Sequence, residues 1–146
     1  MKQATHVLLD AVERLLAFEA GGELRAVEDG TAVAARVYGK LYQHLSPIIG
    51  ESGFQALLAR TVKLSKPAFP ALREVDTMGP ADAVLTQLCA ALKKQAPSAI
   101  AGIVTALLVT FGGLLSTFIG EGLTWKLLHN AWPEALPNEP PSGENA

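Results

Sequence analysis

The most constraining feature of this sequence is a run of 26 residues, positions 95–120, that contains no charged side chain. An uncharged apolar stretch of about 18 residues or more is long enough to cross a lipid bilayer as a helix. The same stretch can instead form the central helix of a soluble bundle, where amphipathic helices bury it. The run therefore leaves two architectures open, and the rest of the chain bears on the choice between them.

Four segments before this run show apolar residues at helical spacing. They cover residues 4–20, 31–45, 52–64 and 81–94. Ser46 and Pro47 are expected to end the second helix, and Pro80 suits the first turn of the fourth. No segment alternates with the period of two that is typical of strands. We predict an all-α fold, a single helical bundle of five to six helices around the long uncharged C-terminal helix.

The amphipathic helices favour the soluble architecture, because their wide apolar faces need a common partner and the uncharged helix supplies one. Small residues also recur at every fourth position in the run, a spacing that lets neighbouring helix backbones approach closely. This expected helix-packing stripe comprises Ser98, Gly102 and Ala106 on one line and Gly112, Ser116 and Gly120 on another. The alternative is a membrane span over residues 98–120. Lys93 and Lys94 would then hold the N-terminal part in the cytoplasm.

The length of 146 residues fits one domain. We expect the helical bundle to occupy residues 1–133, because Pro133 ends the last helical pattern. Residues 134–146 are rich in proline and in acidic or small polar residues, and we expect a disordered tail there. Asp10 and Glu13 interrupt the apolar run that a secretory signal would need, so a cytoplasmic location is expected.

Charge and cysteine usage exclude several classes of function. The net charge is −2, with a pI of about 5.9, so no nucleic-acid partner is expected. Cys89 is the single cysteine, which excludes an internal disulfide and a cysteine-based metal site. Residues 30–73 carry six basic side chains and one acidic one. A candidate basic face for an acidic partner comprises Arg36, Lys40, Arg60 and Lys63, and the alternative is a solvated helix surface.

No motif in the chain carries chemistry. His6, His44 and His129 lie on three different predicted helices and lack the spacing of metal ligands. There is no glycine-rich phosphate loop after a strand, and no nucleophile stands beside a base. We therefore expect no catalytic residue, no metal and no cofactor.

Glu121 is the first charged residue after the uncharged run, and Trp125 and Lys126 follow it by about one helical turn. These three residues are the candidate rim of a ligand or partner site. The alternative is that a helix end emerges from the core there and Glu121 is simply solvated.

Two segments carry a family resemblance, FIGEGLTWKLLHNAWPE and, upstream of it, GFQALLARTVKLSKPAFPAL. They are similar to small all-helical bacterial proteins of unknown function, over about half of the chain. The shared patterns are hydrophobic and contain no catalytic residue. The resemblance implies a bacterial origin and a genuine domain, and it implies no activity.

These observations predict a non-catalytic helical interaction or regulatory module. It would bind another protein, or a second copy of itself, through a groove between amphipathic helices. One alternative is a tail-anchored or conditionally membrane-inserting protein that uses the same uncharged helix. A second alternative is a bundle that binds a small apolar ligand between its helices.

Overall fold

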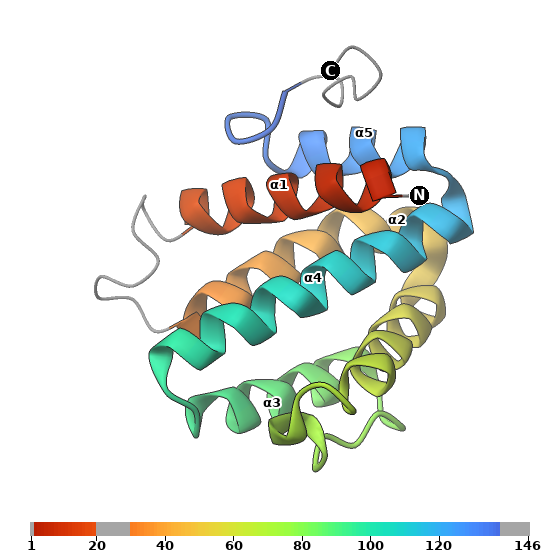
Figure 1. Ribbon diagram of the computed structural model, residues 1–146. Helices are drawn as coiled ribbons and strands as arrows, with labels where there is room; N and C mark the ends of the chain where they lie inside the picture. Colours follow the sequence, from red (N-terminus) through yellow and green to blue (C-terminus); the bar gives the residue numbers. More distant parts are fainter. Residues whose placement is uncertain (1, 20–29, 138–146) are drawn as a thin grey trace.

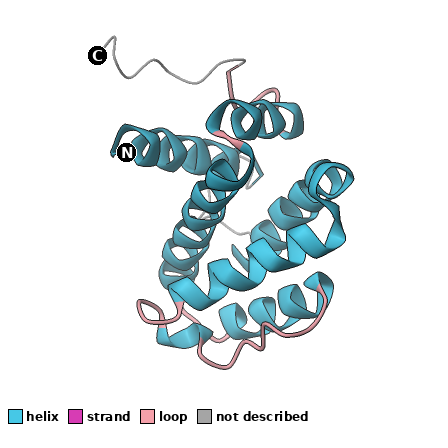
Figure 2. Cartoon of the chain, turned by 90° about the vertical axis from the view of Figure 1, so that its right-hand side faces the viewer, coloured by secondary structure: helices cyan, strands magenta, loops and turns pink. Residues whose placement is uncertain are grey.

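The computed structural model describes residues 2–19 and 30–137, and in these residues all regular structure is helical (Figures 1 and 2). Within these described residues, five α-helices and one short 3₁₀ helix follow one another. They are α1 (Lys2–Glu19), α2 (Gly30–Ser65), the 3₁₀ helix η1 (Pro70–Leu72), α3 (Ala81–Lys93), α4 (Pro97–Ile119) and α5 (Glu121–Ala131). The predicted all-α bundle of five to six helices is confirmed.

The uncharged helix α4 runs through the middle of this arrangement (Figure 1). Helix α2 lies behind it, α1 and α5 lie on one side, and α3 lies on the other. One face of α4 is buried against these neighbours. Its buried residues are Ile100, Ile103, Val104, Leu107, Leu108, Phe111, Gly112 and Leu115. Helices α1, α2 and α5 thus pack against α4, as an amphipathic helix requires, whereas α3 packs mainly against α2.

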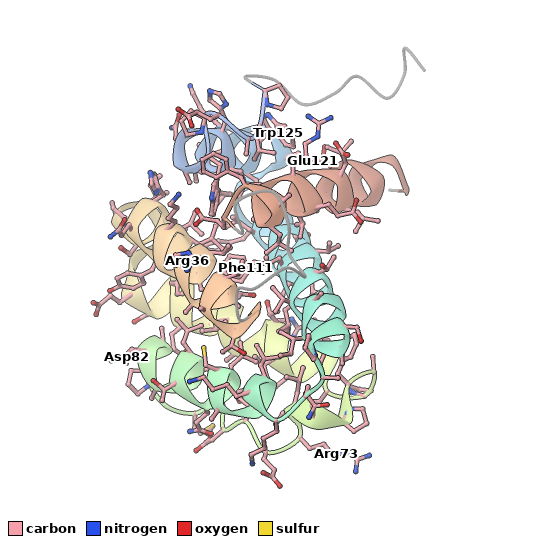
Figure 3. All side chains as sticks on the ribbon, turned by 90° about the vertical axis from the view of Figure 1, so that its left-hand side faces the viewer. Arg36, Arg73, Asp82, Phe111, Glu121 and Trp125 are labelled. Carbon is pink, nitrogen blue, oxygen red and sulfur yellow. The ribbon has the colours of Figure 1, made fainter. Side chains whose placement is uncertain are left out.

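Phe111 of α4 contacts aromatic rings in both segments of α2, before and after Gly50. Its ring centroid lies 5.8 Å from that of Tyr38 and 5.5 Å from that of Phe54. All three side chains are at most 2% exposed. Tyr38 meets Phe111 edge to face, the arrangement that the aromatic quadrupole favours. Figure 3 shows Arg36 on α2 and Phe111 beside it, between the helices.

The break in α2 lies at Gly50, and our prediction that the helix ends at Ser46 and Pro47 is wrong. Pro47 lies inside the helix, shortly before this break. Gly50 has φ 81° and ψ 165°, a conformation that glycine adopts without a steric penalty. The Tyr42 hydroxyl donates a 2.6 Å hydrogen bond to the Glu51 carboxylate and so holds the two segments together across the break.

The proline-containing connector before α3 is fixed by side-chain amides. Gln55 Nε2 donates to the carbonyl oxygens of Thr77, at 3.0 Å, and Gly79, at 2.8 Å. Gln87 Oε1 accepts a 2.7 Å hydrogen bond from the backbone N–H of Asp76. These bonds satisfy backbone groups that no regular element pairs.

Packed structure extends past the expected boundary at residue 133. Leu136 is 2% exposed, and Trp125 Nε1 donates a 3.1 Å hydrogen bond to the Pro137 carbonyl. His129 Nδ1 lies 2.9 Å from the Leu136 carbonyl oxygen. Residues 134–137 therefore belong to the bundle, and the rest of the expected disordered tail, residues 138–146, lies outside the described residues.

Candidate functional site

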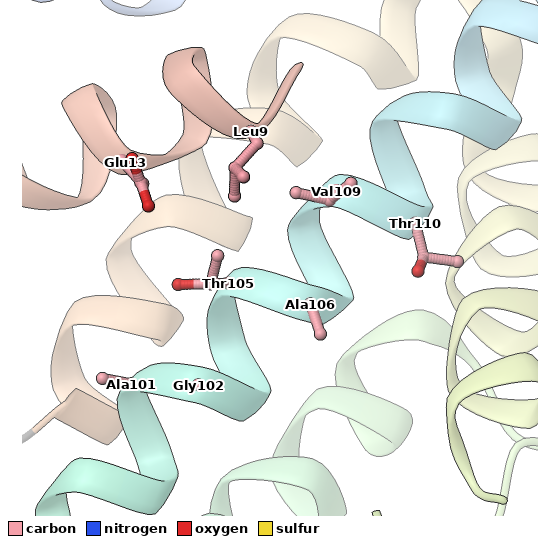
Figure 4. A pocket seen from close by; sticks show the side chains of 8 residues that line it. All are labelled: Leu9, Glu13, Ala101, Gly102, Thr105, Ala106, Val109 and Thr110. Atoms are coloured by element: carbon pink, nitrogen blue, oxygen red, sulfur yellow. The ribbon is translucent and has the colours of Figure 1, made fainter. Parts of the chain in front are cut away.

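The side of α4 that faces away from the core forms one wall of an open groove, and α1 forms the other (Figure 4). The groove has a volume of about 610 Å³. Its lining residues are Leu9 and Glu13 from α1 and Ala101, Gly102, Thr105, Ala106, Val109 and Thr110 from α4. Leu9 and Glu13 point from α1 toward α4. The α4 wall consists of short, uncharged side chains, so another helix can approach its backbone closely.

Glycines on the two sides of α4 have different surroundings. A Cβ atom added to Gly112 would lie 3.0 Å from Cδ2 of Leu8, because α1 packs directly on this point. A Cβ atom added to Gly102 or Gly113 would meet nothing within 4 Å. Close packing of α1 on α4 therefore explains why position 112 is a glycine. No contact within the described residues requires a glycine at position 102 or 113.

The structure divides the helix-packing stripe that we expected from the sequence. Of its three glycines, only Gly112 lies in a close contact between helices. Ser98, Gly102 and Ala106 follow the open side of α4, where the first two are exposed, and Ser116 is half-buried. Gly120 has φ 96° and ends α4, so its role is to turn the chain into α5. The line through Ser98 was expected to pack inside the bundle, and it faces the groove side because the other helices cover only one face of α4.

The three candidate rim residues do not form one surface. Glu121 and Lys126 are exposed, but Trp125 is 6% exposed and its indole nitrogen is used by the Pro137 carbonyl. Glu121 lies in the first turn of α5, where a carboxylate interacts favourably with the helix dipole. Figure 3 shows Glu121 and Trp125 at one end of the molecule and Arg73 at the other.

The candidate basic face is divided by the break at Gly50. Arg60 and Lys63 are exposed on the segment after the break. Arg36 and Lys40, on the segment before it, bind the carboxylate of Glu19 at the end of α1. Arg36 and Lys40 thus form ion pairs with a carboxylate of the same chain, and only Arg60 and Lys63 remain of the candidate basic face.

The Glu19 cluster joins α1, α2 and the end of α5. The Glu19 side chain is 7% exposed and accepts a 2.8 Å hydrogen bond from Trp132 Nε1. The Lys40 ammonium lies 5.5 Å from the ring centroid of Phe18 and 5.6 Å from that of Trp132, within the range of cation–π attraction. Burial acts to raise the pKa of Glu19. The hydrogen bonds from Lys40 and Trp132 and the charges of Lys40 and Arg36 outweigh burial, so the pKa lies below its usual value.

This cluster was missed by the sequence analysis. The hydrogen bond between Glu19 and Trp132 spans 113 residues, and no local pattern reports such a contact. A signal was nevertheless present: Arg36 and Lys40 are separated by one helical turn, so one carboxylate can contact both.

The groove offers little for chemistry. Glu13 is the only charged residue among its described lining residues, and the other polar groups are the hydroxyls of Thr105 and Thr110. Elsewhere in residues 2–19 and 30–137, no group of three metal-binding side chains lies close enough to hold an ion.

Comparisons with protein-family models, with curated proteins and with solved structures found no match. The resemblance of the two segments to small helical bacterial proteins stays a prediction.

Proposed function

We propose that this chain is a non-catalytic interaction module that receives a helix of a protein partner against the open side of α4. One observation carries the proposal: a helix without any charge forms a groove wall of Gly, Ala, Val and Thr residues. The outer face of a helix in a soluble bundle ordinarily carries charged side chains. Amphipathic helices bind other proteins by laying an apolar face into such a groove. A cytoplasmic location is part of the same proposal.

The dimensions of the groove suit a helix better than a small molecule. Helix α4 spans 23 residues, which corresponds to a length of about 34 Å. The volume of about 610 Å³ falls within the usual range for ligand pockets, but this groove is open along α4 and does not enclose its contents. A small apolar ligand would leave much of its own surface in water there.

Membrane insertion is the second candidate, and α4 gives the specific reason for it. Among the described residues, α4 is the helix that is long and apolar enough to cross a bilayer. In the bundle, 44% of its most apolar stretch is buried. Packing opposes insertion, because the eight inward residues of α4 would have to leave the core. Three of these residues, Leu107, Phe111 and Leu115, are each at most 2% exposed in the bundle.

A photocrosslinking amino acid at position 105 tests the proposal in cells that produce the full chain. We expect ultraviolet light to link this position, on the groove wall, to a discrete protein whose mass and peptides identify it. The matched control carries the same amino acid at exposed position 90 on α3, and it should give no such adduct. Adducts that contain only lipid, or equal adducts from both positions, would contradict a helix-docking role.

A further inference from the structure

We propose that the partner on the open side of α4 is a second copy of this chain, which packs its own α4 antiparallel across a two-fold axis. The inference rests on the docking function proposed above and names the partner. It comes from the order of residues along the outer side of α4 and from the charges at its two ends.

The outer side of α4 has the spacing of a helix–helix seam. Gly102, Ala106, Val109 and Gly113 are separated by four, three and four residues, the alternation that keeps positions on one stripe facing a partner helix. Three of them line the groove, and the fourth, Gly113, has open space where a Cβ atom would be. The seam is therefore continuous and unoccupied within the described residues.

The seam is also self-complementary, as a two-fold interface requires. It is symmetric about the midpoint between Leu107 and Leu108. An antiparallel copy centred on this point places Gly102 opposite Gly113 and Ala106 opposite Val109. Each layer of the seam then joins two small residues, so the helix axes can approach to the lower end of the usual packing distance.

Charges at the ends of α4 fit the same register. Lys94, at the end of α3, precedes the helix, and Glu121, at the start of α5, follows it; the two positions are the same number of residues from the midpoint. Both side chains are exposed, and neither has an ion-pair partner in the part of the chain that the structure describes. An antiparallel copy brings each Lys94 toward the Glu121 of the other copy, whereas a parallel copy would bring like charges together. The part of α4 between them carries no charge, and Glu13, the one charged residue that lines the groove, belongs to α1.

Analytical ultracentrifugation of the full chain over a wide concentration range tests the seam. We expect a reversible monomer–dimer equilibrium, and Gly102→Leu or Gly113→Leu should raise its Kd by about tenfold or more, because leucine separates the two helices. The open space at both glycines should leave each monomer folded, as checked by a thermal melt. Ala56→Leu, at an exposed position on α2, is the matched control and should leave the Kd unchanged.

Charge reversal tests the antiparallel register. Lys94→Glu alone should raise the Kd by about tenfold at low salt, because it turns two attractions per dimer into repulsions. Combined with Glu121→Lys, it should return the Kd to within about threefold of the parent value. A dimer that the second change fails to rescue would overturn the register, and with it this proposal.

A chain that stays monomeric at every concentration would overturn self-association. If position 105 still crosslinks to a different protein, the docking function survives and only the identity of the partner is wrong. If the chain instead floats with vesicles of phosphatidylcholine and phosphatidylglycerol and gives no protein adduct, both proposals fail.

Discussion

The inward and outward sides of α4 are equally free of charge, yet they meet different surroundings. On the inward side, Leu107 and Phe111 are almost completely buried by the other helices. On the outward side, Gly102 is exposed, and Thr105 and Val109 line an open groove. Burial within one chain explains the first side only. The absence of charge on the second side needs another cause, and the proposed contact with a further helix would supply it.

The largest expected effect comes from removing α4 and α5 together. A chain of residues 1–95 should fail to fold cooperatively, because α1 and α2 would lose the helix against which they bury their apolar faces, and α3 packs mainly on α2. Circular dichroism and a thermal melt measure this. A stable, cooperatively melting fragment would show that the inward side of α4 is not the core of the other helices.

Aspartate substitutions should separate the two sides strongly. Leu115→Asp places a charge at a position that is 1% exposed, and we expect it to cost about 4–5 kcal/mol or to abolish folding. Thr105→Asp, on the groove wall, should cost no more than about 1 kcal/mol. Urea unfolding of both variants is the measurement, and equal losses would remove the distinction between the sides.

A substitution of Glu19 tests how much its ion pairs stabilise the junction of α1, α2 and the end of α5. Because its pKa is lowered on folding, its contribution to stability is present above the unfolded value of about 4.5 and is lost as the pH falls below that. Glu19→Gln should therefore lower the free energy of unfolding at pH 7 by about 1–3 kcal/mol. The difference from the parent should shrink between pH 4.5 and pH 3. A constant difference over this range would show that the charge of Glu19 does not matter.

The smallest effect is expected at Tyr38, in contact with Phe111 on the inward side. Its hydroxyl is buried without a hydrogen-bond partner among the described residues, and burial raises its pKa. Tyr38→Phe should leave the free energy of unfolding unchanged or raise it by up to about 1 kcal/mol, because the polar atom that must be desolvated is removed. A loss of more than about 1 kcal/mol in urea unfolding would mean that the hydroxyl has a partner in solution.

Helical periodicity predicted the fold well because each helix buries one stripe, and a stripe is visible in the local sequence. Helix ends were harder: Ser46 and Pro47 gave a stop signal, but the break depends on the backbone of Gly50. The candidate site was predicted only in part. A line of small residues is compatible with either side of a helix, so the sequence grouped Gly102 with Gly112. Which line α1 covers depends on packing between distant segments, and so does the contact between Glu19 and Trp132.

The adjacent glycines Gly112 and Gly113 give the most direct test of the difference between the two sides. Replacing each in turn by leucine makes the same change in helix propensity, so only the surroundings differ. Unfolding by urea should be followed at a protein concentration below the Kd of any dimer. Gly112→Leu should lower the free energy of unfolding by about 1–3 kcal/mol, because the new side chain meets Leu8. Gly113→Leu should leave it unchanged or raise it by up to about 1 kcal/mol. Equal changes in the two variants would contradict the assignment of an inward and an open side to α4.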